Sequence, residues 1–201
     1  MVKGGGKLSL SLDIETHIYT DAKGVVIPSV TQIINAAFPY KTHSNAMADY
    51  YRDRGKAVHA AIHFIEKGTL DSASVHKDIW PYIKAYYKFR ENFKYKTLAT
   101  EEIVYKRKFG YCGTLDRRTK GAIWDYKTGV NRYVDGIQLS AYAEAKGMKN
   151  AKRFSVYLMS TGNYWIKEHE ENKTDFRIFL ACFQIYQAKK LHNLLDVQEG
   201  F

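Results

Sequence analysis

The chain has 201 residues and a formal net charge of +10, because 31 lysines and arginines outnumber 21 aspartates and glutamates. This length suits the core of one ordinary domain, and the positive charge favours a polyanionic partner such as nucleic acid. Two cysteines are too few for a disulfide framework or a four-cysteine iron–sulfur cluster, and no apolar run reaches the ~20 residues of a membrane span. We therefore expect a soluble, cytoplasmic protein with no membrane partner.

Apolar residues recur along the chain with the periods of helices and strands. Residues 1–7, rich in glycine and lysine, are expected to form a flexible N-terminal segment, and residues 8–201 a single domain. The predicted elements are, in chain order, a β-hairpin over 8–27, a short helix from 28 to 34 capped by Ser29 or Thr31, helices over 46–67 and 75–95, strands over 98–108, 111–118 and 122–128, a helix over 134–146, strands over 153–160 and 164–168, and a helix over 173–195.

The stretch from Gly113 to Gly129 contains two aspartates and a lysine that strand geometry places together. If Lys120-Gly121 is a two-residue hairpin turn, residues whose numbers sum to 241 face each other, so Asp116 lies opposite Asp125. Lys127 points to the same face, since side chains alternate along a strand. Opposed carboxylates repel each other and favour a compensating cation, so the trio suits a divalent metal site for phosphodiester hydrolysis. A solvated hairpin face is the structural alternative.

Three motifs along the chain carry a resemblance to a known family. Gly113-Thr-Leu-Asp116, Asp125-Tyr-Lys127 and Gln138-Leu-Ser-Ala-Tyr142 resemble the PD-(D/E)xK nuclease superfamily, in particular its RecB-like group. That group includes phage exonucleases and the mitochondrial genome maintenance exonuclease. Gly55-Lys-Ala-Val-His59, on a predicted helix, matches the Gly-x-x-x-His motif that precedes the acidic motifs in this group. The resemblance implies an α/β (α+β) fold with a restriction-endonuclease-like core, a central mixed β-sheet flanked by helices.

The resemblance also implies a role for each matched residue. The lack of four cysteines separates the chain from the iron–sulfur members of the group. The choice between Glu101 and Glu102 as the residue that lines the site stays open, and His63, one turn beyond His59, ranks below it as a ligand. The implied roles are metal binding for His59, Asp116, Asp125 and the carbonyl of Tyr126, catalysis for Asp116, Asp125, Lys127 and Glu101, and nucleic-acid binding for Gln138, Tyr142 and Arg54.

These roles predict a nuclease that requires Mg²⁺ or Mn²⁺ and hydrolyses DNA, most simply as an exonuclease in repair, recombination or phage DNA metabolism. An endonuclease of the same fold is one alternative, and a nucleic-acid-binding module that does not cut is another. The expected partner is DNA, single- or double-stranded, with a recombination or replication protein as a further partner. The expected location is the cytoplasm of a bacterial or phage-infected cell. The residues do not decide the polarity of digestion, DNA against RNA, or the oligomeric state.

Overall fold

The computed structural model describes residues 10–14, 16–39 and 45–195, so the predicted flexible segment 1–7 lies outside them. Five strands form the central sheet in the order β4-β5-β6-β7-β8. Only β6 and β7 run parallel, and every other neighbouring pair is antiparallel. The predicted mixed sheet is thus confirmed. Its strands are β4 (Ala99–Lys106), β5 (Tyr111–Thr119), β6 (Ala122–Lys127), β7 (Lys152–Leu158) and β8 (Tyr164–Glu168).

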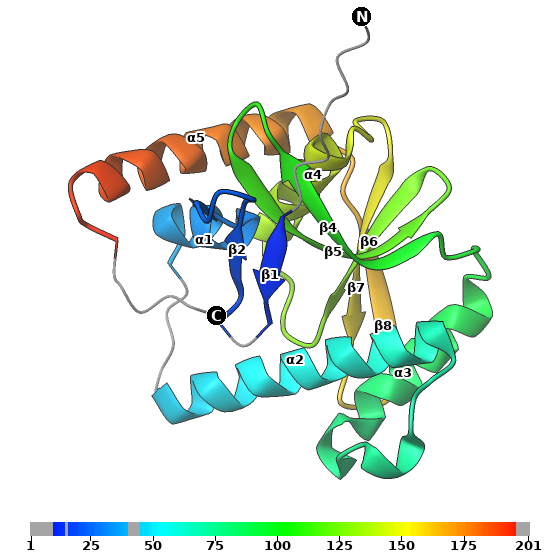
Figure 1. Ribbon diagram of the computed structural model, residues 1–201. Coiled ribbons are helices and arrows are strands. Elements are labelled where there is room, and N and C mark those ends of the chain that lie inside the picture. Colours follow the sequence, from blue (N-terminus) through cyan, green and yellow to red (C-terminus); the bar gives the residue numbers. More distant parts are fainter. Residues whose placement is uncertain (1–9, 15, 40–44, 196–201) are drawn as a thin grey trace, which may run out of the picture.

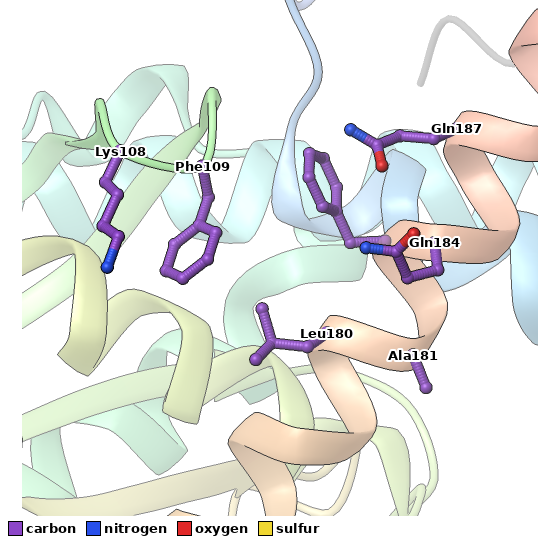
Figure 2. Close-up of a pocket in the computed structure, with 7 residues that line it drawn as sticks. Lys108, Phe109, Leu180, Ala181, Gln184 and Gln187 are labelled. Atoms are coloured by element: carbon purple, nitrogen blue, oxygen red, sulfur yellow. The ribbon is translucent and has the colours of Figure 1, made fainter.

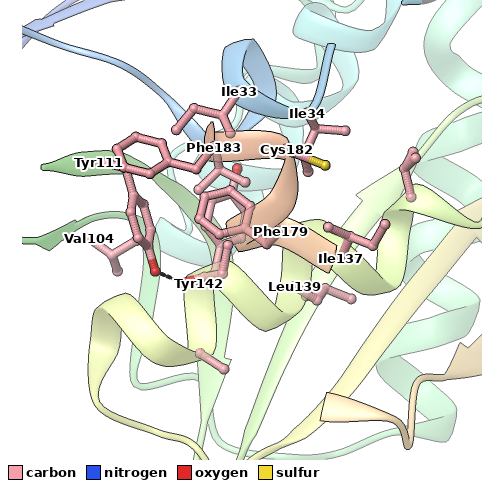
Figure 3. Packing of buried hydrophobic residues seen from close by; sticks show 14 of the residues in the cluster. Ile33, Ile34, Val104, Tyr111, Ile137, Leu139, Tyr142, Phe179, Cys182 and Phe183 are labelled. Atoms are coloured by element: carbon pink, nitrogen blue, oxygen red, sulfur yellow. Dashed lines mark hydrogen bonds between the residues drawn. The ribbon is translucent and has the colours of Figure 1, made fainter. Parts of the chain in front are cut away.

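Helices cover both faces of this sheet (Figure 1). On one face, α1 (Val30–Ala37), α4 (Val134–Lys146) and α5 (Asn172–Leu191) enclose a core that includes Leu115 and Phe179. Figure 3 shows how Tyr111 reaches across this core, where its hydroxyl donates to the carbonyl of Ala141 at 3.0 Å. On the other face, α2 (Asn45–Lys67) and α3 (Trp80–Asn92) pack against Trp124 and Tyr126 of β6. The parallel pair β6 and β7 needs a crossover, which α4 provides.

A small second sheet sits at the start of the described chain. Its strands are β1 (Ser11–Asp13), β2 (Ile18–Thr20) and β3 (Val26–Ile27), in the order β1-β2-β3. The hairpin of β2 and β3 was predicted, whereas the pairing of β1 with β2 was not. The backbone N–H of Cys112 donates to the carbonyl of Pro28 at 3.0 Å and thereby joins this unit to β5. Ser29 is the N-cap of α1 and forms a reciprocal capping box with Gln32.

Most predicted boundaries agree with the structure to within a few residues, and one helix is shorter than expected. The 3-10 turn η1 (Ser72–Ser74) precedes the segment predicted as a helix over 75–95, the 3-10 turn η2 (Lys77–Ile79) lies at its start, and α3 begins only at Trp80. Pro81 explains this start, because a residue without a backbone N–H is tolerated in the first turn of a helix but not in its interior. None of the helices in the described ranges is both long and apolar enough to span a bilayer.

Candidate metal centre

The antiparallel ladder of β4 and β5 is interrupted at one pair of residues. Thr100 pairs with Arg117 and Glu102 with Leu115, but Glu101 and Asp116, which lie between them, form no ladder pair. Glu101 has a φ of 48°, a left-handed conformation that is uncommon for a residue with a side chain. Backbone strain of this kind is frequent at functional sites. The interruption therefore indicates a candidate functional site at this point of the sheet.

The side chains of β5 switch from one face of the sheet to the other at the same point. Leu115 packs in the core beneath α4, whereas the guanidinium of Arg117 lies 5.5 Å from the ring centroid of Phe89 on the other face. Residues two apart in a regular strand share a face, so the chain changes face at Asp116. The Asp116 side chain lies on the face opposite to that of Leu115, where its carboxylate meets His59 of helix α2.

The strands β5 and β6 also separate at Asp116. Their paired residues are Arg117 with Trp124, Arg118 with Ile123 and Thr119 with Ala122, whose numbers sum to the predicted 241. Beyond this point Asp125 pairs with Ser155 on β7. The backbone N–H of Tyr126 donates to Asp116 Oδ2 at 2.6 Å. The predicted register is confirmed, but Asp116 lies at a fork between the strands and not in a continuous ladder with Asp125.

Helix α2 contributes His59 to this fork. The Nδ1 atom of His59 lies 3.4 Å from Asp116 Oδ1, and the His59 side chain is 30% exposed. One candidate ligand atom each from His59, Glu101 and Asp116 lie within 4.8 Å of one another, which makes this trio the group suited to a metal ion among the residues described. Gly55, one turn earlier on α2, faces β6: a Cβ placed there would lie 3.6 Å from the hydroxyl oxygen of Thr128. The sequence motif thus brings α2 close to the end of β6.

A chain of hydrogen bonds holds the predicted lysine next to this trio. Lys127 Nζ lies 2.9 Å from Asp125 Oδ2 and donates to Gln138 Oε1 at 2.8 Å. Gln138 Nε2 in turn donates to the Tyr142 hydroxyl at 3.0 Å. A Cβ at Gly113 would lie 2.6 Å from a ring carbon of Tyr142, so the glycine leaves room for that ring. These contacts fix the Lys127 ammonium on the side of Asp125.

The charges at the fork are strongly coupled. Burial and the nearby Asp116 carboxylate raise the pKa of Glu101 to about 7, and burial, only partly offset by Lys127, raises the pKa of Asp125 to about 7. Burial also disfavours the charged forms of His59 and Asp116, but their mutual attraction outweighs it, raising the pKa of His59 to about 9 and lowering that of Asp116. Three carboxylates share two cationic side chains, so a further cation would relieve their repulsion.

The donor atoms at the fork fit Mg²⁺ or Mn²⁺. Carboxylate oxygens of Glu101 and Asp116 suit Mg²⁺, and the imidazole nitrogen of His59 suits Mn²⁺ as well. Asp125 lies outside the trio, although it was predicted as a ligand. Its buried Oδ2 atom lies 2.9 Å from Lys127 Nζ and forms no other polar contact with a described residue. Metal binding by Asp125 and by the Tyr126 carbonyl remains a prediction.

The structure separates the glutamate and histidine alternatives. Glu102 forms ion pairs with Arg118 at 2.7 Å and Lys146 at 2.6 Å, away from the trio that contains Glu101. The Nδ1 atom of His63 forms a hydrogen bond with the hydroxyl of Thr100 at 3.0 Å, outside the candidate metal group. The predicted nucleic-acid contacts Gln138 and Tyr142 instead contact Lys127 and each other, so that their contact with a substrate remains a prediction.

Arg54, also predicted to contact nucleic acid, has contacts within the protein. Its guanidinium donates to the Thr128 carbonyl at 3.1 Å and lies over the rings of Tyr51 and Tyr82, 4.9 and 4.8 Å from their centroids. Arg54 thereby ties α2 to the end of β6, and nucleic-acid contact remains a prediction.

One polar pair near Lys127 was missed from the sequence. Asp135, buried in the first turn of α4, accepts a hydrogen bond at 2.6 Å from the hydroxyl of Tyr157 on β7. It also accepts the backbone N–H of Arg132 at 3.0 Å and so fixes the segment between Lys127 and α4. An aspartate in the first turn of a helix is a common capping signal, and this signal could have identified Asp135.

No protein-family model matches the sequence, and no curated protein matches it in sequence. Among solved structures, the chain is similar to a proposed exonuclease from Eubacterium rectale, with a TM-score of 0.58 and 10% identity over 85% of this chain and 83% of that one. LHK-Exo, an alkaline exonuclease from Laribacter hongkongensis, and LHK-Exo in complex with dAMP have TM-scores of 0.42, at 12% and 14% identity over 85% of this chain and 95% of theirs. The first similarity shows a shared fold.

Proposed function

We propose that this protein is a divalent-metal-dependent nuclease that hydrolyses phosphodiester bonds in DNA. The observation that carries the proposal is the trio of His59, Glu101 and Asp116 at an interrupted ladder, with candidate ligand atoms within 4.8 Å of one another. The ion pair of Lys127 with Asp125 beside it supplies the cationic group that phosphate chemistry needs. A net charge of +10 agrees with a polyanionic substrate.

We assign some residues of the site to metal binding and one to contact with the phosphate. Glu101, Asp116 and His59 would bind Mg²⁺ or Mn²⁺, with Asp125 at the border of the site. The chemistry that such an ion supplies when bound is Lewis-acid activation of the phosphoryl group and of the attacking water. Lys127 donates to Asp125 and Gln138, contacts that favour its ammonium form. We therefore assign Lys127 to stabilise negative charge on the phosphate and to orient the attacking water.

Exonuclease action is the form of this proposal that we favour over endonuclease action. It rests on the motif resemblance and on the exonuclease name of the similar Eubacterium rectale structure. A role in DNA repair, recombination or phage DNA metabolism, a cytoplasmic location and a recombination or replication partner belong to the same proposal. The non-catalytic alternative is disfavoured because an intact lysine and three carboxylates are kept together at the fork at a cost in charge repulsion.

The test is digestion of end-labelled single-stranded, double-stranded and circular DNA in Mg²⁺, Mn²⁺ or EDTA. We expect labelled linear DNA to be degraded in either metal, circles to stay intact and EDTA to stop the reaction. Cleavage of circles would replace the exonuclease by an endonuclease. Binding without cleavage under every metal condition would support the non-catalytic module instead.

Thermal unfolding tests the metal site independently of activity. An ion that binds only the folded protein stabilises it by about 2.7 kcal/mol at a concentration 100 times its Kd. Mn²⁺ should therefore raise the Tm of the wild-type protein. His59→Ala should abolish this rise, whereas His63→Ala, one helical turn along α2, should retain it. An equal rise in Tm with Mn²⁺ for the two variants would show that His59 is not a metal ligand.

A further inference from the structure

Apart from the fork, the described surface has a hollow that is lined by one aromatic side chain and two lysines. This hollow, of about 610 Å³, is lined by Lys77, Trp80, Pro81 and Lys84 at the start of α3. Trp80 is partly buried against the core beneath α2 and α3, which holds its ring in place, while both lysines are exposed. Neither lysine forms an ion pair with a described residue, so both ammonium groups are available to an anion.

Helix α3, at whose start the hollow lies, is joined to the end of β6 by the contacts of one arginine. Arg54 donates to the carbonyl of Thr128, the residue after Lys127, and its guanidinium lies 4.8 Å from the ring centroid of Tyr82. Tyr82 is two residues beyond Trp80 on α3. Tyr51, 49% exposed, lies against the same guanidinium. Arg54 thus fixes the position of α3, and of the hollow at its start, relative to the end of β6.

We propose that the hollow at Trp80 is a second, non-catalytic binding site for single-stranded nucleic acid. It would hold an unpaired base against Trp80 and the flanking phosphates with Lys77 and Lys84. A single strand is the occupant that fits, because a base inside a duplex is stacked on both faces and cannot offer a face to the indole. The inference rests on the proposed function, since it assigns the strand that the metal centre would cut, and it defines the substrate as unpaired.

A second hollow on the described surface lacks the combination of an aromatic side chain with two lysines that form no ion pair. It has a volume of about 450 Å³ and lies between the turn after β4 and helix α5 (Figure 2). Its single lysine, Lys108, places its ammonium 5.7 Å from the ring centroid of its neighbour Phe109. The rest of its lining comes from neutral residues of α5, namely Leu180, Ala181, Phe183, Gln184 and Gln187. One cation that is already in contact with a ring gives a strand little to bind, so Lys108 is a suitable control position.

The proposal is tested by the anisotropy of a labelled 30-nucleotide oligo(dT) in EDTA, where no cleavage occurs. Trp80→Ala should weaken binding on the order of tenfold, as expected for loss of one stacked base, and Trp80→Phe should weaken it less. Lys77→Ala/Lys84→Ala should make the slope of log K against log salt shallower by about 1.4, for two lost phosphate contacts. Lys108→Ala should match the wild-type protein in both measurements.

An abasic strand of equal length identifies the stacking contact. The wild-type protein should prefer oligo(dT) to the abasic strand, and Trp80→Ala should lose that preference. Equal binding of oligo(dT) by wild-type, Trp80→Ala and Lys77→Ala/Lys84→Ala proteins would overturn the proposal, as would equal competition by a polyglutamate peptide. Trp80→Phe and the lysine double variant keep the test decisive if Trp80→Ala does not fold.

The same variants separate this inference from the proposed function. Cleavage at saturating DNA in Mg²⁺ should keep its wild-type kcat in Lys77→Ala/Lys84→Ala, while the KM rises. A wild-type protein that cuts DNA but loses no affinity with these variants would refute only the second site. A wild-type protein that binds oligo(dT) through Trp80 but never cuts would refute only the nuclease.

Discussion

Two groups of buried polar side chains on the sheet differ in their balance of charge. In the balanced group, Arg153 on β7 is 1% exposed, pairs with Asp175 of α5 at 2.8 Å and donates to the carbonyl of Gly136 at 2.9 Å. His169 beside it forms a hydrogen bond with the hydroxyl of Ser155 at 3.0 Å. Burial, together with Lys167 and Arg153, lowers the pKa of His169 to about 4, which leaves the ring neutral at pH 7. This group has one positive and one negative charge.

The group at the fork has the opposite character. Glu101, Asp116 and Asp125 are held close together with only His59 and Lys127 to oppose them. Arg153 and Asp175 are thus paired where they hold β7 and α5 together, whereas negative charge is in excess at the interrupted ladder. Excess charge costs stability, so we expect changes at the fork to affect chemistry and changes at the balanced group to affect folding.

The largest expected effect is at Asp116. Asp116→Asn should lower metal-dependent DNA cleavage by at least about 10³-fold, since it removes a ligand charge worth several kcal/mol to the transition state. The protein should remain folded by circular dichroism. Asp175→Asn, an equivalent change in the balanced group, should keep nearly wild-type cleavage at a temperature where it is folded. Similar activities for the two variants would erase the distinction between the groups.

The next effect is on stability, at the balanced group. Arg153→Met should lower the free energy of unfolding by about 2–4 kcal/mol, because it leaves the partly buried Asp175 without its partner. Lys152→Met, next to it in sequence, breaks an exposed ion pair with Glu168 and should cost less than about 1 kcal/mol. Urea denaturation measures both. Equal losses for the two variants would mean that the buried pair does not stabilise the domain.

A smaller effect concerns pH and His169. Its pKa is about 4 in the folded protein and about 6.5 when unfolded, so the unfolded state binds more protons between these values. Acidification from pH 6.5 toward 4 should therefore lower the free energy of unfolding, by about 1–2 kcal/mol for a partly exposed ring. Its contribution is fully present above pH 6.5. His169→Gln should flatten this part of the stability curve, whereas the exposed His192→Gln should leave it unchanged.

The smallest expected effect distinguishes the backbone conformation of Glu101 from its charge as contributions to stability. Because its φ is 48°, Glu101→Gly should be more stable than Glu101→Gln by about 0.5–1 kcal/mol. Both variants should lose cleavage, since both lack the carboxylate. If Glu101→Gly were less stable than Glu101→Gln in thermal denaturation, the left-handed backbone would not be a strained feature of the fork.

Turn signals and the periodicity of apolar residues were sufficient to predict most of the fold and part of the candidate site. The two-residue turn at Lys120-Gly121 determined the hairpin register, because side-chain alternation and turn length leave one pairing. The amphipathic segments predicted α2 and α4 within a residue of their bounds, with Gly68 and Gly147 in the left-handed conformation that ends them.

The choice between neighbouring residues of one type needed contacts from distant parts of the chain. Glu101 belongs to the trio at the point where β5 changes face, whereas Glu102 pairs with Arg118 and Lys146. Strand alternation alone cannot predict that change, since it arises where α2, β4 and β6 all meet β5. The sequence by itself determined the two carboxylates and the lysine of one hairpin and indicated His59. Only the tertiary structure brought His59 and Glu101 within 4.8 Å of Asp116, because residues far apart in the chain meet there through the packing of α2 and β4 against β5.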